Sequence, residues 1–231
     1  MRKGLEKDLW SVGESAAGLS VGGCGMKTRV RVYTDYKSPY AFVANRPLLA
    51  LEQSHDVELE WCPYTLRISE YLDAVENRSP HNWRKVRYGY MDARRFANAQ
   101  GLILKGPRRI YNGYYSSVGM LFAQKNNFFM PYHKTVFEMF WAQQLDIDAL
   151  EEMKTVIEHL GGSATDFEAY AEGLGRAEHD QIIADAEARG VFGVPMMLLD
   201  GELFHGGDRI DMLKQRLDGC NRRLPVEVTE R

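Results

Sequence analysis

Residues 29–61 read RVRVYTDYKSPYAFVANRPLLALEQSHDVELEW and contain the clearest fold signal of the chain. It opens on a β-type run through residues 30–33. Ser38-Pro39 then has the form of a helix start, with serine as the N-cap and proline at the first helical position. Pro47 predicts a kink within that helix. Residues 57–61 alternate apolar and acidic side chains, so strand, helix and strand together predict a βαβ unit with a right-handed crossover.

The middle of the chain shows helical periodicity, with apolar residues spaced by three and four. The spans with this spacing are 83–97, 117–124 and 132–140. Asp148 with Glu151 and Thr165 with Glu168 have the spacing of capping boxes, which predicts two further helix starts. We expect five or six helices between residues 68 and 189.

Strand character returns near the end of the chain. Residues 196–199 are apolar, Asp200-Gly201 is a hairpin signal, and Leu203-Phe204 predicts the returning strand. A last helix follows, with Asp208 as its expected N-cap. The order βαβ, helices, ββα predicts an α/β protein with a thioredoxin-like fold and a large all-helical insertion.

This order also suggests how the chain is divided. Residues 28–67 and 190–231 form the expected thioredoxin-like domain, and residues 68–189 form the helical insertion domain. Residues 1–27 are poor in apolar side chains and rich in Gly, Ser and charge, so we expect a disordered leader there. A signal peptide does not fit, because Asp8 and Glu14 interrupt any apolar run.

Composition excludes several function classes. The chain has 231 residues and a net charge of −3, which lacks the positive excess of a dedicated nucleic-acid binder. No apolar run is long enough to cross a membrane. The three cysteines show no C-x-x-C pair and no zinc-ligand spacing, so we expect no metal, a reducing cytoplasmic location and no dithiol chemistry.

Three local signals point to a binding site. Ser38 sits at a strand-to-helix turn, where its exposed hydroxyl and the first helix N–H groups favour an anion such as a thiolate. Residues 190–195, GVFGVP, suggest a cis Pro195 that leaves the Val194 backbone free to pair with an extended peptide. Residues 206–209, GGDR, place an acid at a helix start. Taken singly, each also fits a plain helix cap or an ordinary trans proline.

Together, SPYA at 38–41, GVFGVP at 190–195 and GDR at 207–209 resemble the 2-hydroxychromene-2-carboxylate isomerase and kappa-class glutathione transferase family. This family is a branch of the DsbA-like thioredoxin superfamily, and the resemblance spans roughly residues 29–218. It implies that glutathione lies extended along the fold and that the protein is a homodimer. The chain departs from the family at residues 77–80, Asn-Arg-Ser-Pro, where the family commonly has an Asn and a Pro-Pro pair.

The resemblance assigns roles to individual residues. Ser38 matches the serine that hydrogen-bonds the glutathione sulfur, and Val194 before Pro195 matches the residue whose backbone pairs with the cysteinyl unit. Asp208 matches the acid that holds the γ-glutamyl end. Gly207 stands where the family usually has a small polar residue, so one side-chain contact is lost. Lys85 is the candidate partner of the glycyl carboxylate.

The implied activity is glutathione-dependent isomerisation of an unsaturated aromatic acid of the 2-hydroxychromene-2-carboxylate type. Two alternatives stay open: a kappa-type glutathione transferase, and a non-catalytic DsbA-like binding protein. Tyr40, Tyr88 and Tyr114 are candidates for the substrate pocket, although helical spacing equally fits core positions. His133 and His205 are available as a base, but a lone histidine is more often a core or surface residue.

Overall fold

The computed structural model describes residues 27–219. The expected leader, apart from Lys27, and the last twelve residues of the expected thioredoxin-like domain lie outside this range, as do Cys24 and Cys220. A four-stranded sheet in the order β2-β1-β3-β4 forms the centre of the molecule. Its strands are β1 (Thr28–Thr34), β2 (Val57–Pro63), β3 (Met196–Leu199) and β4 (Glu202–His205).

The predicted βαβ and ββα units are both present. β1 and β2 run parallel in register from Thr28 opposite Val57, and α1 (Pro39–Leu49) with α2 (Leu51–Ser54) connects them. β3 lies antiparallel to β1 and is joined to β4 by the predicted hairpin turn at Asp200-Gly201. Both turn residues have positive φ, as the tight turn requires. The predicted thioredoxin-like order of elements is therefore confirmed.

The helix that follows β1 departs from the expected kink. Pro47 lies inside α1, but the helix is interrupted at Ala50, three positions later, before α2 continues. Proline lacks the donor that would bond Val43 O, and Gln100 Nε2 donates to that carbonyl instead at 2.8 Å. Ala50 keeps a helical conformation, and its N–H still donates to Arg46 O.

Seven α-helices lie within residues 68–189, all of which the structure describes, so the expected five or six was too few. They are α3 (Ile68–Leu72), α4 (Pro80–Ala99), α5 (Tyr114–Lys125), α6 (Phe129–Trp141), α7 (Leu150–His159), α8 (Ala164–Glu172) and α9 (Leu174–Ala188), with a 3-10 turn η1 (Val75–Asn77) before α4. The helices without a signal in the sequence analysis are α9 and α3, and α3 is only one turn long and too short to show periodicity.

Both predicted capping boxes were placed wrongly. The N-cap of α7 is Ala149, which makes no side-chain cap; Asp148 instead accepts hydrogen bonds from Gly113 N at 2.7 Å and from Arg109. The N-cap of α8 is Ser163, whose hydroxyl accepts from Asp166 N at 3.2 Å. A box predicts that a helix starts nearby, but a competing long-range partner or an earlier serine decides which residue caps it.

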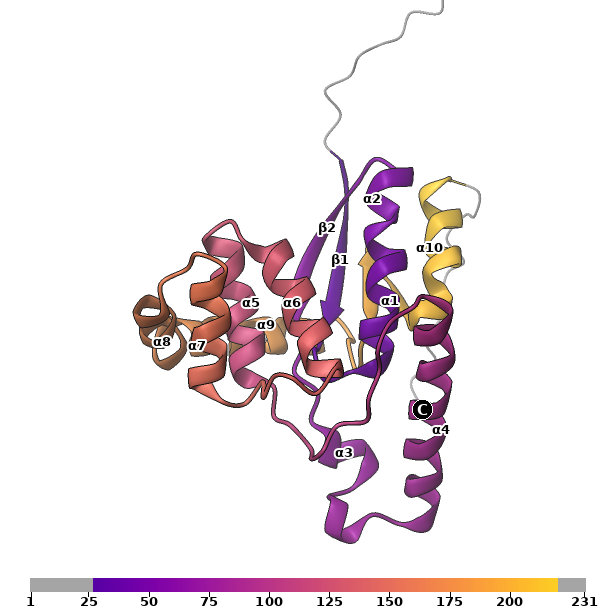
Figure 1. Cartoon of the computed structure of the whole chain (residues 1–231). Helices are drawn as coiled ribbons and strands as arrows, with labels where there is room; N and C mark the ends of the chain where they lie inside the picture. The colour runs from indigo at the N-terminus through magenta and orange to yellow at the C-terminus, as the bar shows by residue number, and fades with distance from the viewer. Residues whose placement is uncertain (1–26, 220–231) are drawn as a thin grey trace, which may run out of the picture.

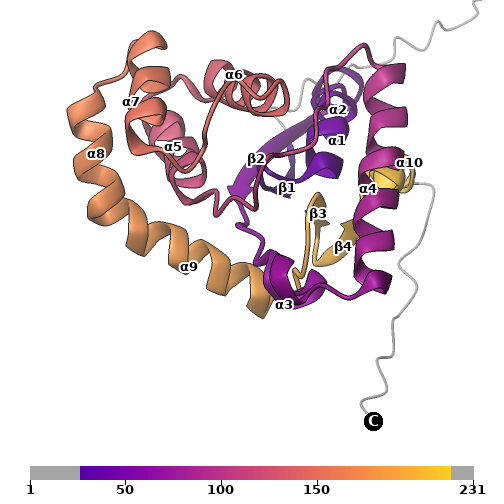
Figure 2. The same cartoon turned by 60° about the horizontal axis from the view of Figure 1, so that its bottom comes forward.

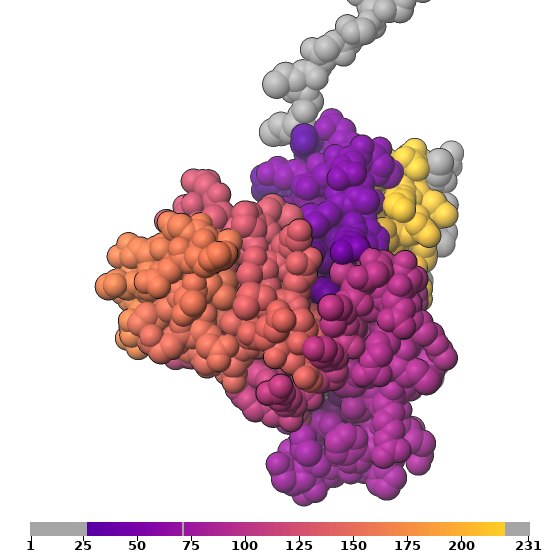
Figure 3. All heavy atoms as spheres, in the orientation of Figure 1, coloured from indigo at the N-terminus to yellow at the C-terminus, as the bar shows by residue number. Residues whose placement is uncertain are grey.

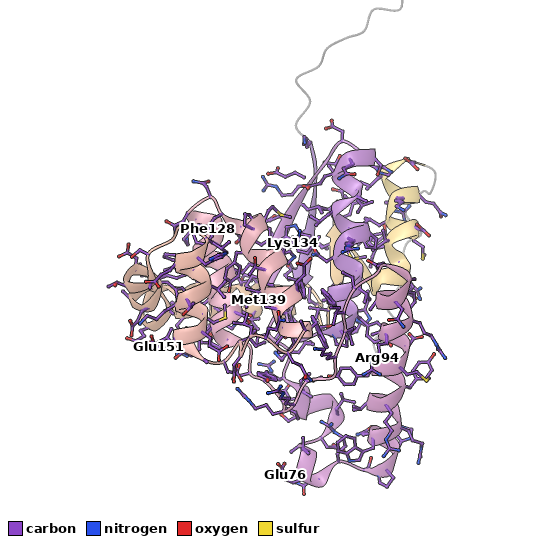
Figure 4. The ribbon with its side chains drawn as sticks, in the orientation of Figure 1. Glu76, Arg94, Phe128, Lys134, Met139 and Glu151 are labelled. Atoms are coloured by element: carbon purple, nitrogen blue, oxygen red, sulfur yellow. The ribbon has the colours of Figure 1, made fainter. Side chains whose placement is uncertain are left out.

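The helices are arranged on two sides of the sheet. Helices α5 to α9 form a block on one side, and α4 with α10 (Ile210–Leu217) stands on the other, as Figures 1 and 2 both show. Helix α4 packs along α1. The segment from α3 to the start of α4 projects from the lower end of the molecule (Figure 3), with Glu76 near its tip (Figure 4).

The core has two parts. The larger lies between the sheet, α1 and the helical block, and includes the fully buried Trp141 and Tyr36. The smaller lies under α1, α2 and α10, around Leu48 and Leu213. Because α1 contributes to both, burial holds the amino end of this helix rigidly against the rest of the fold. No helix within residues 27–219 combines the length and the apolar character that crossing a lipid bilayer requires.

Candidate functional site

A cavity of about 950 Å³ lies at the amino end of α1. One wall comes from the turn at residues 192–194, another from residues 66–94, which include α3 and part of α4, and a third from the loop at residues 106–111. Ser38, Tyr40, Lys85 and Val194, four of the residues predicted from the sequence, all line it. A second cavity of about 700 Å³ lies along β2 and contains none of them. The first cavity is therefore the candidate site.

Ser38 caps α1 as predicted. Its Oγ accepts from Ala41 N at 3.2 Å and lies 3.5 Å from Val194 O. The prediction that its hydroxyl is exposed was wrong. Ser38 is only 4 % exposed, because the turn before β3 covers it. An O–H···O bond is ordinarily 2.5–3.0 Å, so the long contact leaves the Ser38 proton available to a nearer acceptor in the cavity.

The turn that faces Ser38 has the expected form. The Val194–Pro195 peptide bond is cis. Among residues 27–219 the Val194 N–H has no backbone partner. Pro195 itself is buried and does not line the cavity, and its carbonyl accepts from Gly206 N at 2.9 Å. The backbone at Val194 is thus free to pair with an extended ligand.

The walls of the cavity are basic and apolar. None of the described residues that line it is an Asp or a Glu. The basic residues among them are Lys37, Arg78, Lys85, Arg87, Arg94, Arg108 and Arg109. Aromatic and aliphatic side chains make up most of the rest, including Trp83, Tyr90 and Phe192. Such a surface suits an anionic ligand with an aromatic or apolar body.

Four of these cations have protein partners, and three do not. Arg109 is clamped by Asp146 at 2.9 Å and Asp148 at 2.7 Å. Arg94, labelled on α4 in Figure 4, donates its Nε–H to Leu104 O at 3.2 Å. Arg78 donates to the Leu72 and Asp73 carbonyls, and Lys37 is paired with Asp35. Lys85, Arg87 and Arg108 make no ion pair or hydrogen bond with other described residues, which leaves their charges available to a ligand.

The turn before Ser38 contains a buried ion pair that the sequence analysis missed. Lys37 Nζ lies 2.6 Å from Asp35 Oδ2, with side-chain exposures of 5 % and 0 %. Asp35 Oδ2 also accepts from Leu66 N, and Lys37 Nζ also donates to Asn112 O. The sequence does contain a signal for this pair, because two opposite charges lie between a buried strand and a Ser-Pro helix start. Charged side chains in such a place are rarely buried unless they are paired.

Two of the predicted pocket tyrosines lie elsewhere. Tyr40 lines the cavity, and its hydroxyl donates to Asp92 Oδ2 at 3.1 Å; burial raises its pKa to about 12. Tyr88 is 56 % exposed on α4, outside the lining. Tyr114 donates its hydroxyl to Ala171 O at 2.6 Å within the helical block. Helical periodicity alone does not reveal which face of a helix meets the cavity.

Gly207 and Asp208 also lie outside the lining. Residues Gly207–Arg209 form a 3-10 turn, η2, so the N-cap of α10 is Arg209 and the predicted cap Asp208 was wrong. The Asp208 carboxylate is exposed and pairs with Arg209 at 2.6 Å. At Gly207 an added Cβ would lie 3.2 Å from Ala44 Cβ, so the lack of a side chain here permits close packing on α1.

The two candidate histidines differ in position. His133 is fully buried behind α1, bonded to the Tyr36 hydroxyl and to Asn45 Oδ1, and burial lowers its pKa to about 3. His205 lines the cavity with its ring 4.7 Å from Phe192. Burial lowers its pKa, and the Asp208 charge opposes this effect. Residues 27–219 contain no cluster of three or more His, Cys, Asp or Glu side chains suited to a metal.

Comparison with known proteins matches residues 29–218 to the DSBA-like thioredoxin domain family. A 2-hydroxychromene-2-carboxylate isomerase of Pseudomonas sp. (strain C18) is 30 % identical over 83 % of this chain and 91 % of its own length. One from Pseudomonas putida is 28 % identical over 81 % and 93 %. A solved 2-hydroxychromene-2-carboxylate isomerase superposes with a TM-score of 0.69 at 26 % identity, over 83 % of this chain and 95 % of its own.

Proposed function

The chain belongs to the DsbA-like thioredoxin domain family, among relatives named 2-hydroxychromene-2-carboxylate isomerase, and on this premise we propose that it is a glutathione-dependent isomerase of unsaturated aromatic acids. One observation carries the proposal. A single cavity contains the capped amino end of α1, the free Val194 backbone and a wall of cations without acidic residues. These are the features that an anionic, thiol-bearing, extended peptide requires.

The residues present fit glutathione. Lys85 is the proposed partner of the glycyl carboxylate, and Arg87 and Arg108 add two further unpaired cations to the same cavity. The central amide groups of glutathione are complementary to the backbone of Val194, as an added strand is to a sheet edge. Its sulfur then falls near Ser38, because the Ser38 hydroxyl and the Val194 carbonyl are 3.5 Å apart.

When bound, glutathione supplies a thiolate that adds to a conjugated double bond and leaves again, so that the bond rotates in between. Ser38 donates its hydroxyl proton toward the anion, while its own oxygen stays fixed by Ala41 N. The amino end of α1 favours negative charge at the same point. The cationic wall holds the carboxylate of the aromatic acid, and Trp83 with Phe192 packs against its ring.

Calorimetric titration of the full chain with reduced glutathione tests the proposal, with Ser38→Ala as the matched variant. We expect glutathione to bind and the bound thiol to have a lower pKa in the wild type than in the variant. Turnover of 2-hydroxychromene-2-carboxylate should fall about tenfold in the variant for each unit by which its thiol pKa is higher. Absence of binding at millimolar glutathione would refute the use of glutathione. Unchanged turnover in Ser38→Ala would refute the role of Ser38.

The cationic wall is tested by charge removal on α4. Lys85→Gln should weaken glutathione binding about fivefold, which corresponds to about 1 kcal/mol for an exposed charge pair. Arg84→Gln is the matched control, because Arg84 lies on the same helix, is exposed and does not line the cavity. Equal losses in both variants would show that only the general charge of α4 matters.

Product analysis separates the isomerase from its alternatives. An isomerase returns free glutathione and an isomer of the same mass, whereas a transferase leaves a thioether adduct that is heavier by one glutathione. Binding without turnover would favour a non-catalytic protein. The divergent segment contributes to the cavity: Ser79 caps α4, Pro80 begins it, and Leu72, Val75 and Arg78 are among the lining residues.

A further inference from the structure

Lys37 is a buried cation at the edge of the candidate site. It directly precedes Ser38, its side chain is 5 % exposed, and it lines the cavity. Asp35, its partner, has a fully buried side chain and does not line the cavity. Lys37 is therefore the member of the pair that reaches the cavity lining.

Hydrogen bonds hold both the Lys37 ammonium and the Asp35 carboxylate in place. Lys37 Nζ donates to Asp35 Oδ2 at 2.6 Å and to Asn112 O at 2.7 Å. An ammonium group has three N–H donors, and the third has no acceptor among residues 27–219. Asp35 Oδ1 accepts from Lys37 N at 3.1 Å, and Oδ2 also accepts from Leu66 N at 2.8 Å. The carboxylate is thus held by the turn and by Leu66 N, while one N–H of the ammonium has no acceptor among the described residues.

We propose that Lys37 is an anion-stabilising residue of this site, acting beside Ser38 on the negative charge that forms at the amino end of α1. Asp35 sets the strength of this effect, because its charge partly cancels that of the ammonium. The inference rests on the proposed function for the identity of the anion, a glutathione thiolate. The effect of Lys37 on the potential at Ser38 does not depend on which anion binds.

A purely structural role is the competing explanation. The pair joins three segments: the turn after β1, the segment that begins at Leu66, and the loop at Asn112. Loss of this junction would lower stability and alter ligand affinity whether or not the charge acts on the site. The test therefore requires a readout that follows charge and not packing, and that works without glutathione.

A thiol introduced by Ser38→Cys provides that readout, because its pKa reports the potential at this position. We would titrate it by thiolate absorbance, with the Ser38 chain as the blank for the three native cysteines. Adding Lys37→Met should raise the pKa of the introduced thiol by about one unit, a tenfold loss of thiolate at neutral pH. Lys37→Arg should keep it near the starting value. The other groups facing the cavity near this point, Tyr40 and His205, are the same in every variant.

Asp35→Asn distinguishes the two explanations by the direction in which it shifts the pKa of the introduced thiol. It removes the negative half of the pair, so the pKa of the introduced thiol should fall, whereas Lys37→Met raises it. A structural role predicts no such opposition. If Lys37→Met does not fold, the double variant Asp35→Asn with Lys37→Met leaves no unpaired buried charge. The pKa of the introduced thiol should then be higher in the double variant than in Asp35→Asn alone. Equal pKa values with and without Lys37 would overturn the inference.

Reduced glutathione supplies the second arm, using thiolate absorbance of the bound ligand. If the wild type binds no glutathione, the proposed function fails, while the thiol introduced at position 38 still decides the role of Lys37. If glutathione binds and its thiol pKa does not differ between the wild type and Lys37→Met, the inference fails and the proposed function stands.

Discussion

His133 should make the protein lose stability as the pH falls below about 6.5. This side chain is fully buried, and burial lowers its pKa to about 3, whereas an unfolded chain gives histidine a pKa of about 6.5. Above pH 6.5 the residue is neutral in both states and contributes no pH dependence. Below it, only the unfolded state binds a proton, so unfolding becomes easier. The neutral ring is satisfied in the fold, since Tyr36 and Asn45 lie 3.0 Å from its two nitrogens.

The size of the effect follows from linkage. Each pH unit between the two pKa values costs about 1.4 kcal/mol, so lowering the pH from 6.5 to 5 should cost about 2 kcal/mol through His133 alone. Urea unfolding across this range measures it before most carboxylates titrate. His133→Gln should remove that part of the slope, and His159→Gln, an exposed histidine in the last turn of α7, should retain it. Equal slopes in the wild type and His133→Gln would refute the assignment of a buried, neutral imidazole.

Three further predictions follow from the packing. Gly119→Ala should destabilise the protein by about 1–3 kcal/mol in urea unfolding, because the added Cβ would lie well inside contact distance of the Tyr132 hydroxyl. Ser163→Ala should cost about 1 kcal/mol by the same measurement, whereas Thr165→Ala should cost much less, since Ser163 is the cap of α8. Tyr114→Phe should leave kcat/KM unchanged while lowering stability by about 1 kcal/mol, because its hydroxyl serves the helical block; a fall in kcat/KM would return it to the substrate pocket.

The sequence predicts those parts of the fold whose signals are local. Ser38-Pro39 marks α1 because a strand precedes it and an apolar run follows, and the structure has both. Ser79-Pro80 begins α4 in the same way, with Ser79 Oγ accepting from Asn82 N. The sequence analysis noted residues 77–80 only as a departure from the family pattern and did not use Ser79-Pro80 as a helix start. The same local signal therefore marks the start of both helices.

The candidate site is predictable only in part. Sequence alone singles out Ser38 and Val194, which fold to within 3.5 Å of each other. It does not single out Arg108, because the loop at residues 106–111 has no periodicity and reaches the cavity through the clamp of its neighbour Arg109 on Asp146. Contacts between distant segments, such as Lys37 with Asn112, leave no local pattern.

The central position of β1 has a consequence for how the protein is made. β2 follows β1 closely in the sequence, so the two can pair early in synthesis, but the other neighbour of β1, β3, comes only after the whole helical block. The 156 positions between Ser38 and Val194 take about 10–30 s to synthesise at ordinary rates. For that time one edge of β1 has no strand beside it, and an open strand edge invites pairing with another chain. Nascent chains that stop before β3 therefore carry both an unfinished site and an exposed edge.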